Sequence, residues 1–322
     1  LARRGSPVSR RMAKIAGPPD PEVIGNRVHS GLRLGKSTSS AAGSDSRHAS
    51  PLLLGQLCAC AALDGSDSVL LPSTMQALQA YLGLGMRQIA TMNLAQAVAL
   101  ASSGPLWGML ADQQVLQRKT ILSAGAICQG LFTIALGLAS GYPVMLVLRA
   151  FNGIVLSTLK PVANGIVADV TSEAYRGGAY GWIDFSLQFG MMLGALLATP
   201  ISMVEIAGIP GWRLAYAIIG STCILVGLTI AMTMEEPPRE QDDSGRVRPE
   251  GRSVRDEIAG LVSDLRTPTF CTIVTQGCFG SVPGNAMSYQ TLFFQVGGIG
   301  NSGAAALQAC QMGVSAVGRL LG

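Results

Sequence analysis

Five charged side chains fall inside stretches of sequence that are otherwise apolar enough to cross a lipid bilayer. They are Asp64, Asp67, Arg149, Lys160 and Asp184. A charge near the centre of a bilayer costs at least about 2.5–3.5 kcal/mol on insertion scales, so such residues are rare and usually serve a pathway for ions or solutes. A carboxylate can carry a proton, and a cationic side chain can neutralise that carboxylate or hold an anion. These residues are therefore the first candidates for a translocation site.

The amino-acid composition explains why a bilayer is the expected surrounding. Hydrophobic residues make up 48% of the 322 positions and charged residues only 13%, which is too apolar for a soluble domain of this length. Many of the 40 glycines lie inside apolar runs, as in tightly packed membrane helices. The seven cysteines also lie in apolar stretches, without a CxxC pair or the spacing of metal ligands. We therefore expect neither a metal site nor a cofactor.

Windows of largely apolar residues, about 20 positions long as a spanning helix requires, recur after Pro51. The first window is interrupted by Asp64 and Asp67, and the seventh by a Pro-Gly-Asn run at 283–285. The predicted fold class is all-α, a polytopic membrane helical bundle. Eight spans are predicted, at residues 52–78, 90–111, 120–140, 142–168, 178–203, 212–233, 269–296 and 302–322.

Polar segments divide the chain into four predicted parts. Residues 1–50 are rich in Arg, Ser, Gly and Pro, which predicts a disordered basic cytoplasmic tail, with an organellar transit peptide as the alternative. Residues 51–236 are predicted to form a six-helix transmembrane bundle, and residues 237–267 a cytoplasmic linker loop rich in arginine. Residues 268–322 would then be the first two helices of a second bundle.

The distribution of basic residues predicts an orientation in the membrane. If the tail is cytoplasmic, then Arg118, Lys119 and Arg176 fall on the cytoplasmic side with the linker loop, whereas Arg87 and Arg213 fall on the opposite side. This excess of positive charge satisfies the positive-inside rule. The chain is thus expected to be a multi-pass integral membrane protein.

The seventh and eighth windows resemble a second copy of the first and second. Shifting the sequence so that Gly83 falls on Gly297 also places Gly104 on Gly318. Such repeats are typical of transporters built from two parallel halves around a central site. Because the sequence stops at Gly322, inside the second copy, we expect a fragment with about 8 of 12 spans.

The segment GMLADQQVLQRK, at 108–119, resembles the loop signature of the major facilitator superfamily, G-x-x-x-D-(R/K)-x-G-R-(R/K), at the expected place between the second and third spans. Gly108 would let two helices approach closely, and Asp112 would accept charge-assisted hydrogen bonds at the membrane edge. Together with Arg118 and Lys119, they are predicted to form a conformational latch. The alternative is a turn whose two basic residues only anchor to lipid headgroups. Gln113 replaces the usual base of the signature, which predicts a weaker latch.

Further segments are similar to a plant and algal branch of this superfamily that is related to spinster-like transporters. They are RAFNG at 149–153, GAYGW at 178–182, PGWR at 210–213 and QGCFGSVP at 276–283. The resemblance implies alternating access, in which two six-helix halves rock about a cavity at the bilayer midplane. Spinster-like relatives carry a glutamate after the arginine of the fourth span and an arginine beside the acid of the first. This chain has neither, so a spinster-type lipid substrate is not expected.

The resemblance also implies that the first and fourth spans line the cavity, which makes their charges possible partners. Our hypothesis is that Asp64 or Asp67 carries a coupling proton, with Arg149 or Lys160 as its counter-charge or as the anchor for an anionic group of the substrate. Alternatively, Lys160 extends to the membrane surface, Arg149 lies at the outer interface, and Asp184 lies near the cytoplasmic end of its helix.

Two glycines of the fifth span, Gly190 and Gly194, form a stripe of small residues that predicts close helix packing. One interpretation is a sliding surface against the eighth span, near Gly313. The other is static packing of two helices.

Secondary transport of a small solute is the function that the sequence favours. An enzyme is not expected, because HExxH, GxSxG and phosphate-loop motifs are absent and both histidines, His29 and His48, lie in the tail. A non-transporting receptor on a transporter fold and an inactive fragment stay as alternatives. The expected partners are the lipid bilayer, an unknown small solute and protons, without nucleic acid, and the complete protein is expected to be a monomer.

Overall fold

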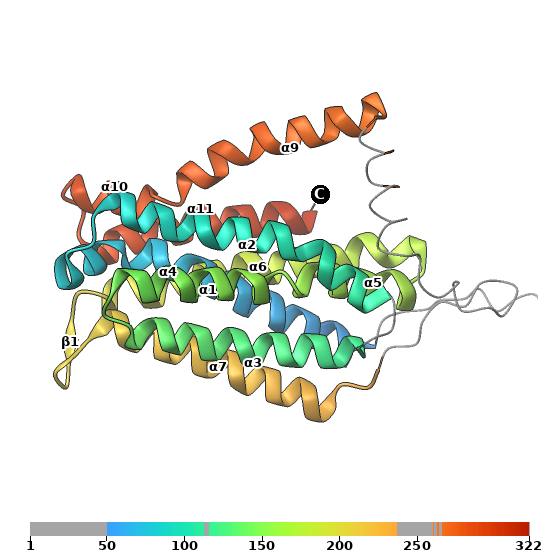
Figure 1. Ribbon diagram of the computed structural model, residues 1–322, viewed down its shortest axis with the longest axis horizontal. Helices are drawn as coiled ribbons and strands as arrows, with labels where there is room; N and C mark the ends of the chain where they lie inside the picture. Colours follow the sequence, from blue (N-terminus) through green and yellow to red (C-terminus); the bar gives the residue numbers. More distant parts are fainter. Residues whose placement is uncertain (1–49, 113–115, 237–259, 261–262, 264–265, 322) are drawn as a thin grey trace, which may run out of the picture. The chain divides into compact units, whose positions relative to one another are not determined.

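The computed structural model describes residues 50–112, 116–236, 260, 263 and 266–321. The predicted tail and most of the predicted linker loop lie outside these residues. Six of the eight predicted windows correspond to one helix each, whereas the fourth and the seventh are each divided between two helices. Long helices lie side by side along one axis (Figure 1). The only strands described are a two-residue antiparallel hairpin, β1 (Glu205–Ile206) and β2 (Ile209–Pro210). The helices are α1 (Pro51–Leu82), α2 (Met86–Asp112), α3 (Arg118–Leu138), α4 (Tyr142–Leu156), α5 (Leu159–Val170), α6 (Glu173–Ile201), α7 (Gly211–Thr233), α9 (Pro268–Met287), α10 (Gln290–Val296) and α11 (Asn301–Leu321).

The fourth predicted window is broken into α4 and α5, which corrects the expectation of one continuous helix. Pro161 has no N–H group to donate to the carbonyl of Ser157, and its ring also crowds that carbonyl. The chain responds with a tighter turn, in which the Thr158 amide donates to Val155 at 3.0 Å. The carbonyl of Ile154 accepts instead from Trp107 Nε1 at 2.8 Å and Ser157 Oγ at 2.7 Å. The Ile154 carbonyl, which the tighter turn leaves without the Thr158 amide, is thus hydrogen-bonded by two side chains.

Glycines set the closest helix contacts. On α6, a Cβ added at Gly190 would overlap the Ala62 carbonyl of α1, and one added at Gly65 of α1 would overlap the Leu187 carbonyl of α6. Gly130 of α3 and Gly220 of α7 face each other in the same way. Small residues let membrane helices approach until their backbones touch, which adds dispersion contacts that lipid cannot replace.

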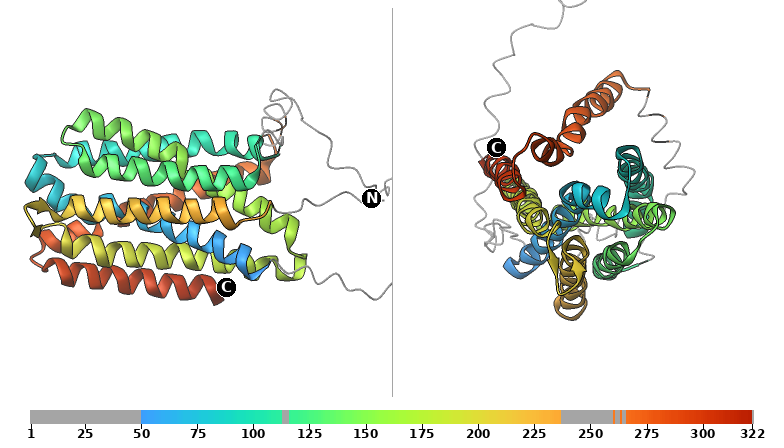
Figure 2. Two further views of the ribbon diagram at one scale, coloured as in Figure 1. Left: turned by 90° about the horizontal axis from the view of Figure 1, so that it is seen from below. Right: turned by 90° about the vertical axis from the view of Figure 1, so that its left-hand side faces the viewer.

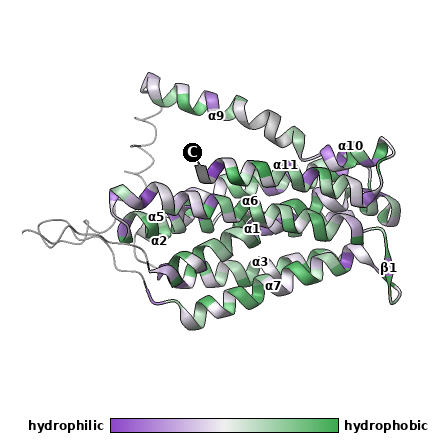
Figure 3. Cartoon of the chain, turned by 180° about the vertical axis from the view of Figure 1, so that it is seen from behind, coloured by the Kyte–Doolittle hydropathy of each residue, from purple (hydrophilic) through white to green (hydrophobic). Residues whose placement is uncertain are grey.

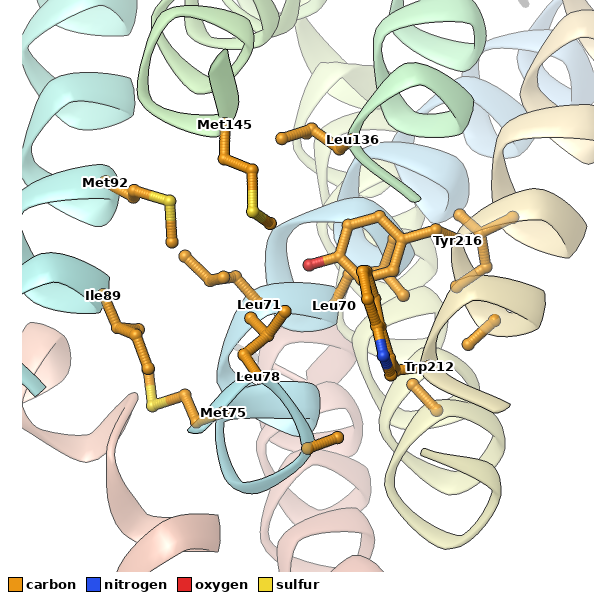
Figure 4. Close-up of a cluster of buried hydrophobic side chains, with 14 of the residues drawn as sticks. Leu70, Leu71, Met75, Leu78, Ile89, Met92, Leu136, Met145, Trp212 and Tyr216 are labelled. Atoms are coloured by element: carbon orange, nitrogen blue, oxygen red, sulfur yellow. The ribbon is translucent and has the colours of Figure 1, made fainter. Parts of the chain in front are cut away.

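Two hydrophobic clusters fill the bundle, one near each end of the helices. The hairpin-end cluster centres on Trp212 and Tyr216, whose rings meet edge to face at 6.0 Å (Figure 4). The opposite cluster joins the start of α1 to α5 and the end of α7, and contains Leu57, Ile166 and Ile230. Along the helices, the two clusters leave a middle section between them, and polar side chains occupy it.

Apolar residues predominate along the helices of the bundle, as the hydropathy colouring shows (Figure 3), and many of them are exposed. Exposed side chains include Leu131, Val147, Leu225 and Phe279. In the described residues, five helical segments are long and apolar enough to cross a membrane: α2, α3, α4 with α5, α6 and α7. An apolar exterior around a polar interior is the arrangement expected in lipid.

The ends of α1 and α10 match in the proposed internal repeat to within one residue. Gly83, with φ 64°, is the C-cap of α1, and Gly297, its partner in the repeat, is the C-cap of α10 and precedes Gly298 with φ 91°. Positive φ is a conformation that glycine adopts without steric cost. Beyond these caps, α2 and α11 begin at corresponding places, and α11 then lies beside α6 (Figure 2).

Candidate functional site

A buried ion pair occupies the polar middle of the bundle. Asp67 of α1 and Arg149 of α4 approach to 3.9 Å between Oδ2 and Nη1, and each side chain is 1% exposed. The Asp67 Oδ2 atom accepts no hydrogen bond from the described residues, and Arg149 Nε donates none to them. The pair is therefore held mainly by charge, in surroundings from which solvent is excluded.

Three uncharged side chains close this pair into a ring. Thr133 of α3 donates to Asp67 Oδ1 at 2.5 Å, and Asn152 Nδ2 of α4 donates to Thr133 Oγ1 at 3.3 Å. Gln96 Nε2 of α2 donates to Asn152 Oδ1 at 2.9 Å, and Arg149 Nη1 donates to Gln96 Oε1 at 3.1 Å. The ring thus connects four helices, and its hydrogen bonds are coupled, so a change at one member alters the bonds of the others.

The ring extends into the hairpin-end cluster. Arg149 Nη2 donates to the Tyr216 hydroxyl of α7 at 3.4 Å, and that hydroxyl lies 3.4 Å from Thr74 Oγ1 of α1. Figure 4 shows the Tyr216 hydroxyl directed inward, toward the leucines of α1. Arg149 is therefore buried inside the bundle, which rules out the alternative that it lies at the outer interface.

The local sequence explains how the ring is positioned. Arg149 and Asn152 are three residues apart, so both project from one face of α4. Gly153, the next residue, faces the Gln96 backbone so closely that a Cβ there would overlap the Gln96 carbonyl. The contact between α2 and α4 thereby brings Gln96 within reach of both partners.

The sequence prediction named Asp67 and Arg149 but missed the uncharged members of the ring. Gln96 and Thr133 of the ring, and Tyr216 beside it, each stand alone among apolar neighbours, which is a weak signal in membrane helices. Asn152 had a stronger signal, because its spacing from Arg149 places it on the same helix face.

The other predicted charges lie outside this ring. Asp64, one turn before Asp67, is half-buried beside Gln129 and interacts electrostatically with Lys160. Lys160 is exposed near the start of α5. Asp184 of α6 is 52% exposed and lies 4.0 Å from Arg319 of α11, a partner that the sequence analysis did not name.

The residues of the predicted latch gather where α3 begins. Arg118 is buried and forms an ion pair with Asp169 near the end of α5, at 2.5 Å. Its backbone amide and that of Lys119 donate to the two carboxylate oxygens of Glu236, at 3.0 and 3.1 Å, so this carboxylate caps α3. Both acidic partners were missed, because they follow apolar windows and could be taken for surface residues.

For Gly108 and Asp112, the other two residues of the predicted latch, the structure gives fewer contacts. Gly108 faces Pro161 of α5, at 3.7 Å from the position of an added Cβ. Asp112 is the last residue of α2, and its side chain lies outside what the structure describes.

The predicted small-residue stripe of α6 faces α1. Gly190 and Gly194 lie against Ala62 and Ser66, and Ser66 Oγ donates to the Gly190 carbonyl at 2.9 Å. Gly313 of α11 instead faces the sulfur of Met192. The stripe therefore packs within the first bundle rather than against α11.

The sequence pattern of the Major Facilitator Superfamily matches residues 57–322. A probable 4-methylmuconolactone transporter of Cupriavidus pinatubonensis is 28% identical over 48% of this chain and 36% of its own length. The multidrug resistance protein MdtG of Escherichia coli is 27% identical over 56% of this chain and 42% of its own.

Solved structures show the same fold. A bacterial homologue of the human lysosomal transporter spinster, in an inward-facing and unoccupied conformation, superposes with a TM-score of 0.67 and 22% identity, over 84% of this chain and 62% of that one. A D-xylose–proton symporter superposes with a TM-score of 0.63 and 16% identity, over 82% and 66%. The chain thus spans about two fifths of the curated relatives that it matches. It is a multi-pass integral membrane protein, and it belongs to the Major Facilitator Superfamily.

Proposed function

We propose that this chain forms part of a secondary carrier that moves a small solute by alternating access, and that a proton on Asp67 is coupled to that movement. The observation that carries the proposal is the closed ring around Asp67 and Arg149. Superfamily membership supports a carrier rather than an enzyme. Because the relatives are matched over only part of their length, their named solutes indicate no more than a small molecule.

Asp67 is suited to exchange a proton because one of its oxygens is uncommitted. The Thr133 hydroxyl occupies Oδ1, whereas Oδ2 faces Arg149 without a hydrogen bond among the described residues. A proton on Oδ2 removes the negative charge that Arg149 faces. The attraction between the guanidinium group and the carboxylate is then lost, which favours a shift of the guanidinium group toward its other acceptors, Gln96 and Tyr216. Protonation would thus change the bonds between α4 and its neighbours.

The break between α4 and α5 offers a place where such a change can become a movement. Residues 157 and 158 lie one turn beyond Asn152, and the turn is held by side chains of α2, Trp107 and Ser103, the latter 2.7 Å from Ser157 Oγ. At the far end of α5, Asp169 is bound to Arg118. We propose that this ion pair, with Glu236 at the start of α3, stabilises one conformation of the carrier.

Charge gives the proposed orientation. Arg118, Lys119 and Arg176 lie at the end of the bundle where α3 and α6 begin, whereas Arg213 lies at the hairpin end. The positive-inside rule favours a cytoplasmic location for the first group. We therefore propose that the helix ends near Arg118 face the cytoplasm.

Proton movement in proteoliposomes tests the proposed coupling. The full chain is reconstituted with an internal pH dye, and small organic acids, sugars and amines are added in turn outside. We expect at least one solute to drive a proton flux that Asp67→Asn abolishes while solute exchange at equal pH continues. Glu205→Gln, which removes an exposed carboxylate from the hairpin, should leave the flux unchanged. Solute-driven proton flux that persists in Asp67→Asn and in Asp64→Asn/Asp67→Asn would show that the proposed coupling is wrong.

A further inference from the structure

A pocket between α5 and α6 contains charged groups outside the buried ring. It has a volume of about 280 Å³, and apolar side chains from both helices line it together with Lys160, Asn164, Tyr180 and Asp184. Pockets for drug-sized ligands have volumes of about 300–1,000 Å³, so a pocket just below this range suits a solute smaller than a drug. Its mixed lining offers both an apolar surface and a few groups that fix orientation.

The charges of this pocket do not cancel. Asp184 is directed to Arg319 of α11 at 4.0 Å, which leaves its charge partly compensated. Lys160 forms no ion pair within 4.0 Å with any residue that the structure describes, Asp64 and Asp184 included. The pocket therefore presents an exposed ammonium group that has no described carboxylate within 4.0 Å, although the Asp184 carboxylate lines the same pocket.

The structure also separates the two cations that the sequence left as alternatives. Arg149 is 1% exposed and its guanidinium is bonded to Gln96 and Tyr216, so no solute reaches it without opening the ring. Lys160 is exposed, on the segment that follows the helix break. Only the second cation is available to a ligand in this conformation.

We infer that this pocket recognises the carboxylate group of a small organic anion, with Lys160 as its counter-charge. The inference rests on the proposed function, because it identifies the class of solute that the carrier takes. The exposed Asn164 side chain lies in the same wall, and its amide group can donate to the second oxygen, whereas the Tyr180 hydroxyl already donates its hydrogen to the Asn164 backbone carbonyl at 3.3 Å. A single ammonium group matches one carboxylate, whereas phosphate sites in proteins are often built around an arginine fork, and no arginine lines this pocket.

Protection of lysines from reductive methylation tests this inference without an identified substrate. The chain has four lysines, Lys14, Lys36, Lys119 and Lys160, so mass spectrometry can follow each one. The full chain in lipid nanodiscs is treated with benzoate, succinate and citrate, and with benzamide and succinamide as neutral analogues. We expect at least one carboxylate to slow the methylation of Lys160 about tenfold, the effect of one charge-assisted hydrogen bond, while Lys119 is unaffected. Protection by no carboxylate, or equal protection by the amides, would overturn the inference.

Variants then assign the effect to the side chain. The protecting carboxylate should raise the melting temperature of the wild type and of Lys160→Arg, but not that of Lys160→Gln. Arg87→Gln, which removes an exposed positive charge at the hairpin end, should keep the shift. A shift that persists in Lys160→Gln contradicts the inference. The binding experiments apply no pH gradient, so they do not depend on proton coupling. If carboxylates bind but drive no proton flux, only the proposed coupling is rejected. If uncharged solutes alone drive a proton flux, only the proposed class of solute is rejected.

Discussion

The charges of this bundle are used in two contrasting ways. Asp67 and Arg149 are paired by charge inside a closed ring, with side chains that are 1% exposed. Lys160 and the Asp184–Arg319 pair lie at an open pocket, where Asp184 is 52% and Arg319 47% exposed. In the first arrangement each charge faces its counter-charge, whereas in the second Lys160 has no carboxylate within 4.0 Å among the residues that the structure describes.

This difference follows from the surroundings of each charge. Inside the bundle an unmatched ion would keep most of its desolvation cost, so the ring must supply a counter-charge and hydrogen bonds from the protein. At the pocket, water can solvate the ammonium group until an anion replaces it. A charge in an apolar window can therefore serve either the packing and switching of the helices or the recognition of a solute. Burial and pairing distinguish the two.

The largest expected effect comes from removing one member of the buried pair. Arg149→Leu leaves the Asp67 carboxylate buried without a counter-charge, and should lower the free energy of unfolding by about 3–5 kcal/mol. Lys160→Leu, the same change at the open pocket, should alter it by less than about 0.5 kcal/mol. Unfolding in mixed detergent micelles, followed by circular dichroism, measures both.

A double variant sharpens this contrast. Asp67→Leu/Arg149→Leu removes both charges together, so it should recover much of the stability that either single change loses. If Arg149→Leu and Lys160→Leu destabilise the chain equally, or if the double variant shows only the sum of the single losses, the ring is not a closed electrostatic unit.

The second expected effect concerns the contact between α1, which carries Asp67, and α6, which carries Asp184. A Cβ at Gly190 would overlap the Ala62 carbonyl, so Gly190→Ala should force the helices apart and cost about 1–3 kcal/mol. Gly178→Ala lies on the same helix with open space around it, and should be neutral or stabilising by up to about 1 kcal/mol. Thermal melts of the two variants compare them. Equal melting temperatures would mean that this contact is loose.

The helices that carry the ring and the pocket could be predicted from the sequence. In lipid, a long apolar run must satisfy its own backbone hydrogen bonds, which makes it helical. The break in the fourth window had a visible cause in Pro161, but its position depends on whether tertiary contacts hold the free carbonyl. Here Trp107 does so, from a helix about 50 residues away in sequence. A single contact between two helices that are distant in sequence produces no periodic pattern in the sequence, so it could not be predicted.

The ring and the pocket could be predicted only in part. Charges in apolar windows are conspicuous, which is why Asp67, Arg149 and Lys160 were found. Which acid meets which base depends on the rotation of each helix, and glycine contacts between helices distant in sequence fix that rotation. Gly153 against Gln96 is one such contact, and the spacing of residues along a single helix does not reveal it.

The smallest expected effect comes from the exposed pair at the pocket. At 4.0 Å and about half exposed, the Asp184–Arg319 ion pair should contribute at most about 1 kcal/mol to stability. Arg319→Gln leaves Asp184 less compensated beside Lys160, so it should weaken carboxylate protection of Lys160 about two- to fivefold in dilute salt. At about 1 M salt, where charges are screened beyond about 3 Å, wild type and variant should converge. The Lys160→Gln variant should stay without a carboxylate-induced shift at either salt concentration, because it lacks the group that contacts the anion. A salt-independent loss in Arg319→Gln would instead mean that Arg319 itself touches the solute, and that α11 completes the pocket.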